Sequence, residues 1–332
     1  MLKKIVRKAK KKILITIVCS VIILFLVNIA ASYKELAYIS SKDEICFTTK
    51  LLDKNMLAIW SKKQPLKVNI LDISKKDWNI VDILMTSDKN YFVVGTATAI
   101  ELYNLEGKVS EYKLDLGLLG EKAISATISD INNDGLDELL IISGEADSEY
   151  GRRLRVYEFD NDFREVFEQD FGDMNPWKVQ VCDVDGDGQE EISIAMYKTT
   201  VFNSVMAKRP YIYSWQNGTT APKWRGSRLS RPFDDYIFVN IDGDGADEII
   251  AIEMLEDGRK VVNSYKWKGF GFEGFAESES FEEIYAIQHQ DSEGDRVIAK
   301  VRNGSSQRWV VFEYNDGKLS VVSTMDKYIP EI

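Results

Sequence analysis

The sequence predicts an all-β protein: a β-propeller of four-stranded blades, preceded by one N-terminal transmembrane helix. The propeller follows from a unit of four short apolar runs, separated by turn residues, that recurs about every 50 residues. Units of this length favour radial stacking of sheets over a sandwich. The helix follows from an uncharged apolar stretch near the N-terminus, and no long helical pattern comes after it.

The N-terminal region has the pattern of a signal anchor. Residues 1–12 carry seven basic side chains and no acidic one, and residues 13–32 are uncharged and mostly apolar. Because basic flanks stay in the cytoplasm, we expect a single-pass protein of the cell membrane with its N-terminus inside. Small residues at 28–32 leave a second interpretation open, in which a signal peptide is cleaved and the protein is secreted. Residues 33–43 are predicted to be a short linker, and residues 44–332 the extracellular propeller.

Six repeat units account for the predicted propeller, with five or seven blades as the alternatives. The three clearest blades are expected at about 123–175, 176–233 and 234–281. Weaker units cover 81–116 and 284–322, and the weakest runs from 44 to 80. Alternating apolar residues and Asn-Gly-type turns within the units predict antiparallel hairpins.

Each of the three clearest units carries one acidic loop between its first and second runs. Loop one (130–138), loop two (183–191) and loop three (240–248) share the pattern Asp/Asn-x-Asp/Asn-x-Asp-Gly-x-x-Glu. A single copy is explained equally well as a solvated turn, because Asp, Asn and Gly are common turn residues. Three copies at equal places in a repeat favour a metal site, since oxygen ligands on alternate residues suit calcium.

The pattern predicts five ligands in each loop. Side chains at positions one, three, five and nine and the backbone carbonyl at position seven would surround one ion, while glycine at position six permits the sharp turn. An EF-hand instead needs a glutamate at position twelve, which these loops lack. We therefore expect up to three structural calcium ions, held most tightly by loop two with its four carboxylates. The predicted ligands are Asp130, Asn132, Asp134, Leu136, Glu138, Asp183, Asp185, Asp187, Gln189, Glu191, Asn240, Asp242, Asp244, Ala246 and Glu248.

The loops and their flanking runs resemble the FG-GAP/VCBS repeats of integrin-like β-propellers. The resemblance is strongest over 123–255 and weaker over 44–122 and 256–324. It implies a propeller with calcium in loops between two strands of a blade, and a role in binding or scaffolding more often than in catalysis. The chain departs from the pattern at Asn240, which replaces the usual first Asp. It departs again near Asp88 and Asp291, where the ligand set is incomplete.

The sequence contains no recognised catalytic motif. The single histidine, His289, leaves no site built from several histidines, and the match of 269–274 to G-x-G-x-x-G has no helix after it. The paired carboxylates of a glycosidase stay possible, because acidic residues are plentiful. Because no catalytic motif is present, we expect a protein that is not an enzyme.

Two functions follow from the sequence. The first is a membrane-anchored, extracytoplasmic, calcium-binding module that acts as a non-enzymatic scaffold for a protein or glycan partner. The second is a carbohydrate-active propeller, either a lectin or a glycosidase. The aromatic stretch 215–224, with Arg225 and Arg228, fits either function or plain packing between blades. The net charge of −11 argues against a nucleic-acid partner, because phosphate repels an acidic protein.

Overall fold

The computed structural model describes residues 38–40, 44–51, 54–61, 68–72, 78–86, 90–104, 109–226, 228–291 and 295–325. The predicted transmembrane helix at 13–32 lies outside these residues. Within them, no helix has the length and the apolar surface needed to cross a membrane. The chain divides into two compact units, residues 1–77 together with residue 332, and residues 78–331.

The first unit contains one antiparallel sheet whose strands pair in chain order. Its strands are β1 (Tyr38–Ser40), β2 (Glu44–Leu51), β3 (Lys54–Ser61) and β4 (Val68–Asp72). Two boundaries differ from the sequence prediction. β1 lies inside the predicted linker (33–43), and residues 78–80, predicted to close this sheet, begin the next one instead. A three-residue strand is too short to show alternation, and the run at 78–80 continues into 81–85 without a turn.

The second unit consists of five groups of four strands, and each group is an antiparallel meander. Short 3₁₀ turns, Leu116–Leu119 and Gly172–Met174, precede the second and third groups. The strands are β5 (Trp78–Met85), β6 (Asn90–Thr96), β7 (Ala99–Asn104), β8 (Val109–Asp115), β9 (Glu121–Ser129), β10 (Glu138–Glu145), β11 (Arg153–Phe159), β12 (Phe163–Asp170), β13 (Pro176–Cys182), β14 (Glu191–Thr200), β15 (Asn203–Gln216), β16 (Thr219–Arg225), β17 (Phe233–Val239), β18 (Glu248–Met254), β19 (Lys260–Trp267), β20 (Phe272–Ser278), β21 (Glu283–Asp291), β22 (Asp295–Asn303), β23 (Ser306–Asn315) and β24 (Lys318–Met325).

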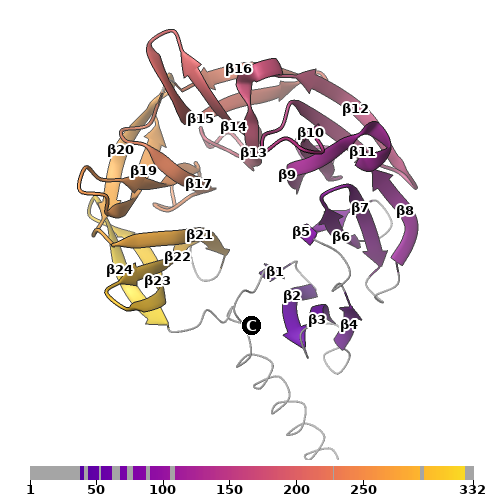
Figure 1. Ribbon diagram of the computed structural model, residues 1–332, viewed down its shortest axis with the longest axis horizontal. Coiled ribbons are helices and arrows are strands. Elements are labelled where there is room, and N and C mark those ends of the chain that lie inside the picture. The colour runs from indigo at the N-terminus through magenta and orange to yellow at the C-terminus, as the bar shows by residue number, and fades with distance from the viewer. Residues whose placement is uncertain are drawn as a thin grey trace, which may run out of the picture. The chain divides into compact units, whose positions relative to one another are not determined.

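The groups of the second unit are stacked side by side through their first strands. β5 contacts β9, β9 contacts β13, β13 contacts β17, and β17 contacts β21, and Figure 1 shows these first strands on the inner side of the sheets. A short parallel pairing of β20 with β24, in which Ser278 lies opposite Leu319, joins the last two groups. Four-stranded meanders stacked in this way are blades of a β-propeller, which confirms the predicted propeller, while the number of blades stays a prediction.

The core lies between neighbouring blades. The second strands β10, β14 and β18 begin with six or more consecutive buried residues, because a neighbouring blade covers each of their faces. Between two of the blades, Leu140 and Ile142 of β10 pack in one cluster with Ile192 and Ile194 of β14. The continuous apolar runs that follow each acidic loop in the sequence are therefore strands buried on both sides.

Truncation of a core side chain in β18 tests this packing. Ile250 is fully buried between the blades formed by β17–β20 and β21–β24, so Ile250→Ala should lower the free energy of unfolding by about 2–5 kcal/mol. Val322 in β24 is half exposed, and Val322→Ala should change the same quantity by less than about 0.5 kcal/mol. Urea unfolding measures both values. Equal losses in the two variants would contradict an interblade core.

Candidate metal centre

The three acidic loops occupy equivalent places in three consecutive blades. Each loop leaves the end of a first strand and leads to the start of a second strand: loop one joins β9 to β10, loop two joins β13 to β14, and loop three joins β17 to β18. The predicted position of the acidic loops, between the first and second strands of a blade, is therefore confirmed.

The side chain at position one holds the loop closed. Asp130 accepts hydrogen bonds from the N–H groups of Asp134 (3.0 Å) and Gly135 (2.7 Å). Asp183 does the same in loop two, where the N–H of Gly188 lies 2.8 Å from Oδ2. Asn240 has only one acceptor oxygen, and its single such bond, from Gly245, is longer at 3.3 Å. A carboxylate at position one therefore organises the turn better than an amide does.

Two positions of each loop adopt left-handed backbone. Position six is glycine in every loop, and its φ is 87° in Gly135, 80° in Gly188 and 96° in Gly245. Position four also has positive φ and is occupied by asparagine or glycine, the residues that tolerate this conformation best. Position six was predicted from the sequence as the site of the sharp turn, whereas position four was not, although its asparagine and glycine residues carry the same signal.

The glutamate at position nine is buried in each loop. Glu138, Glu191 and Glu248 are 2%, 3% and 0% exposed. One oxygen of each accepts the N–H of the second residue of its own loop, at 3.0, 3.1 and 3.0 Å. Burial raises the pKa of Glu138 and of Glu248 to about 7, and it raises the pKa of Glu191 in the same direction. A buried carboxylate of this kind needs a positive partner.

Two of the loops bring three carboxylates together. One oxygen from each of Asp183, Asp185 and Asp187 lies within 4.8 Å of the others, and so do single oxygens of Asp242, Asp244 and Glu248. In loop three, Oε1 of Glu248 is buried and accepts no hydrogen bond of normal geometry, although a lysine ammonium group lies 3.3 Å from it. All these donors are oxygens, so the set fits a hard cation such as calcium.

Loop one is arranged differently from the other two. The amide of Asn132 donates a hydrogen bond to Oε1 of Glu138 at 2.7 Å, and its oxygen accepts the N–H of Asp134 at 2.8 Å. Asp134 in turn accepts the N–H of Leu136 at 2.9 Å. Bonds within the loop therefore hold the predicted side chains, and Asp130, Asp134 and Glu138 are not brought within 4.8 Å of one another as the carboxylates of the other two loops are.

Two lysines that the sequence analysis missed reach into the other loops. Lys223 of β16 lies 2.5 Å from both Asp185 and Glu191 of loop two. Lys266 of β19 contacts Asp242 of loop three and lies 2.6 Å from Asp244 and 3.3 Å from Glu248. The loop spacing gives no signal for either lysine, because strand pairing brings them there from other parts of the blade.

The loops are also linked from blade to blade. The amide of Asn133 in loop one donates to the carbonyl of Gly188 in loop two at 3.2 Å. Asp183 of loop two and Asp247 of loop three form two bonds: Asp183 N–H to the Asp247 carboxylate (2.9 Å) and Asp247 N–H to the Asp183 carbonyl (2.7 Å). Changes in one loop can therefore be transmitted to the next.

Some of the predictions made for these loops stay open. The N–H groups of the position-seven residues are held by the aspartates at position five, but their role as carbonyl ligands stays a prediction. Asp88 lies outside the described residues, as does most of the connection after Asp291. The expectation of incomplete ligand sets at these two places is therefore untested.

A glycine substitution tests the geometry of loop two. At Gly188, where φ is +80°, an added Cβ would meet no atoms, so Gly188→Ala should cost about 1–2 kcal/mol through backbone strain alone. Gly274 is the matched control, because its φ is outside the left-handed region and its Cβ would make ordinary contact with Tyr265. Thermal unfolding compares the variants, and equal melting temperatures would argue against the turn.

Comparison with known proteins supports the repeat and the fold. Residues 130–193, which span loops one and two, match the family described as FG-GAP-like repeat. A search of curated proteins found no match for this chain. The structure is similar to the Dos1 propeller, with a TM-score of 0.53 and 9% identity over 88% of this chain and 71% of that one.

A second solved structure of similar fold is a putative 6-phosphogluconolactonase from Bacteroides uniformis. Its TM-score is 0.52 at 9% identity, over 86% of this chain and 83% of that one. Likeness at this identity concerns the fold alone. The chain thus contains an FG-GAP-like repeat within a β-propeller.

Proposed function

We propose that the protein is a non-enzymatic binding module that recognises a protein partner outside the cytoplasm. A six-bladed propeller would present the binding surface, the apolar segment at 13–32 would anchor it in the membrane, and calcium would stabilise its acidic loops. The observation that carries this proposal is an exposed apolar tip on the hairpin of β14 and β15.

This hairpin is longer than any other in the second unit's described part. β14 has 10 residues and β15 has 14, and the turn between them carries Val201 and Phe202, which are 98% and 93% exposed. Val205 and Met206 follow on β15 and are 65% and 43% exposed. Single exposed apolar residues are common, but four within six positions form the type of patch found where proteins bind one another.

The base of the hairpin is braced by a buried cation. Arg209 is fully buried, and its guanidinium donates hydrogen bonds to the carbonyl groups of Lys198 and Val205, each at 2.8 Å. These bonds tie β14 to β15 just below the apolar tip. A tip held in one conformation loses less entropy on binding than a loose loop, which favours a role in recognition.

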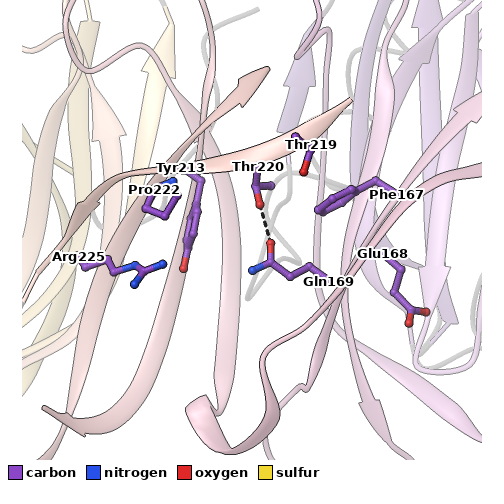
Figure 2. Close-up of a pocket in the computed structure, with 8 residues that line it drawn as sticks. All are labelled: Phe167, Glu168, Gln169, Tyr213, Thr219, Thr220, Pro222 and Arg225. Atoms are coloured by element: carbon purple, nitrogen blue, oxygen red, sulfur yellow. Dashed lines mark hydrogen bonds between the residues drawn. The ribbon is translucent and has the colours of Figure 1, made fainter. Parts of the chain in front are cut away.

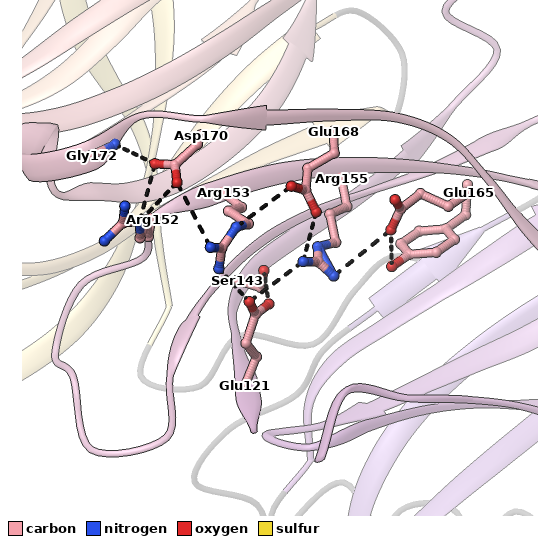
Figure 3. A network of polar contacts seen from close by, with 10 residues as sticks. Glu121, Ser143, Arg152, Arg153, Arg155, Glu165, Glu168, Asp170 and Gly172 are labelled. Atoms are coloured by element: carbon pink, nitrogen blue, oxygen red, sulfur yellow. Dashed lines mark hydrogen bonds and ion pairs between the residues drawn. The ribbon is translucent and has the colours of Figure 1, made fainter. Parts of the chain in front are cut away.

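The carboxylates outside the loops give little support to catalysis. Among the described residues, one cluster of carboxylates lies on the blade of β9–β12, where Glu121, Glu168 and Asp170 are paired with arginines (Figure 3). Arg155 is itself buried between Glu121 and Glu168. His289 lies on β21, with its ring nitrogen 2.7 Å from Asp295. Acids committed to arginine pairs in this way act as structural charges.

A groove between two blades favours a glycan partner as the second candidate. Phe167 and Tyr213 line a cavity of about 310 Å³ between the two blades (Figure 2). Thr220 of one blade donates a hydrogen bond to Gln169 of the other at 2.5 Å. Arg225, from the aromatic stretch noted in the sequence, lines the same cavity. Aromatic rings beside hydrogen-bonding groups suit a sugar ring.

Calcium should stabilise the folded protein. Extracellular modules bind calcium with dissociation constants of about 10⁻⁴–10⁻³ M, so a tenfold excess over that constant contributes about 1.4 kcal/mol for each occupied loop. We expect the melting temperature of the full chain in detergent to rise by about 3–6 °C relative to chelator. Magnesium should give a smaller rise, because it demands stricter octahedral geometry. Identical melting temperatures in calcium and in chelator would falsify the calcium role.

Substitution at the hairpin tip tests the binding function. The full chain carrying Phe202→Asp should lose its partner on mild crosslinking and co-purification, because a charge cannot enter an apolar interface without cost. Val322→Asp is the control, since Val322 is half exposed on β24, far from the tip along the chain. The wild type and the control should capture the same protein.

The two candidates give different results in a second assay. A glycan array read together with a hydrolysis assay should be negative for the wild type if the partner is a protein. Binding to a glycan that Arg225→Ala abolishes, with no effect of Phe202→Asp, would favour the groove. Hydrolysis of a glycan would contradict a non-enzymatic module altogether.

A further inference from the structure

The lysine in loop two comes from a bulge in the outermost strand of the blade. In the pairing of β15 with β16, Ile212 lies opposite Trp224 and Tyr213 opposite Pro222, so Lys223 has no partner of its own. A bulge re-aims the extra side chain. Lys223 therefore reaches the loop, where its ammonium group lies between Asp185 and the buried Glu191.

The lysine in loop three is set by ordinary strand register. Tyr265 of β19 lies opposite Ile249 of β18, which places Lys266 beside the buried Glu248 that starts β18. Its ammonium group contacts all three converging carboxylates of the loop. Lys266 is only 19% exposed, so its charge is poorly screened by water and acts strongly on its neighbours.

Loop one has no such cation at either place. The residue of β11 that corresponds to Lys266 is Glu158, because the preceding Tyr157 lies opposite Leu139. The bulge residue of β12 that corresponds to Lys223 is Val166, between the pairings of Phe167 and Glu165. Among the described residues, no lysine or arginine forms an ion pair with Asp130, Asp134 or Glu138, the predicted carboxylate ligands of loop one.

We propose that Lys223 and Lys266 are built-in cations that occupy loops two and three, and that loop one is the principal calcium site. This inference rests on the proposed calcium role. An ammonium group and a calcium ion repel each other and compete for the same oxygens, so calcium binds at loops two and three only after the lysine leaves. Loop one then binds calcium more tightly than loop two, whereas the number of carboxylates alone predicts tighter binding at loop two.

The structure gives a physical reason for a lysine at these places. A buried carboxylate without a partner destabilises the fold, and a tethered ammonium group supplies its counter-charge whatever the calcium concentration. Glu191 and Glu248 therefore have a counter-charge even when no calcium is bound. In loop one, the buried Glu138 has only the amide of Asn132 and a backbone N–H as partners, so a bound ion has most to contribute there.

Calcium titration of the full chain in detergent, by isothermal titration calorimetry, tests the proposal. We expect one ion per wild-type chain, and loss of that ion in Asp130→Asn. Lys223→Met and Lys266→Met remove the ammonium group and keep the length of the side chain. Each should add a second ion, or tighten binding at its loop at least tenfold.

Two further variants control for unrelated effects. Lys266→Arg keeps the positive charge and should gain no ion. Lys113→Met removes a lysine whose exposed pair with Asp115 lies outside the loops, and it should leave calcium binding unchanged. If a methionine variant folds poorly, its melting temperature tests the proposal instead. In chelator, the melting temperature of that variant should fall below that of Lys113→Met, and added calcium should raise it again.

The outcomes separate this inference from the calcium role itself. Three ions of similar affinity in the wild type, with no change in the methionine variants, would overturn the inference and leave calcium binding intact. Absence of calcium from the wild type and from every variant would overturn both. An ion in the wild type that Asp130→Asn does not remove would also contradict the assignment to loop one.

Discussion

The site depends on one constraint: a glutamate is buried at the start of the second strand in three consecutive blades. Each of Glu138, Glu191 and Glu248 accepts an N–H from its own loop, and that bond fixes how the loop leaves the first strand. A carboxylate removed from water must find a positive charge or hydrogen-bond donors, because otherwise its burial destabilises the fold. The blades meet this demand in two ways, with a lysine in loops two and three and with the side-chain amide of Asn132 in loop one.

Much of the fold could be predicted from the sequence because its signals are local. The apolar runs on both sides of each loop predicted the strands, and the spacing of Asp, Gly and Glu predicted the loops. The N-terminal boundary of the first sheet was predicted incorrectly, because β1 has only three residues. Lys223 and Lys266 could not be predicted, because a bulge and a strand register place them beside the loops. Register is a property of the paired sheet, not of a short stretch of sequence.

The need to compensate buried charge also separates the role of the acidic loops from that of the hairpin tip. The loops lie where blades meet, and bonds such as Asn133 to Gly188 and Asp183 to Asp247 join one loop to the next. Their charges are used for stability within and between blades. In the proposed function, recognition falls to a part of the propeller outside the loops, the apolar tip at Val201 and Phe202, which is exposed in the described part of the chain. A propeller can change such a hairpin without disturbing its core.

The most direct test of charge compensation in the loops is a crystal structure of the protein grown in calcium, with anomalous scattering to locate the ions. The account predicts one strong anomalous peak, at loop one among Asp130, Asp134 and Glu138. It also predicts that Lys223 and Lys266 keep their contacts with the carboxylates of loops two and three. Peaks of equal height in all three loops, with both lysines turned out into solvent, would contradict it.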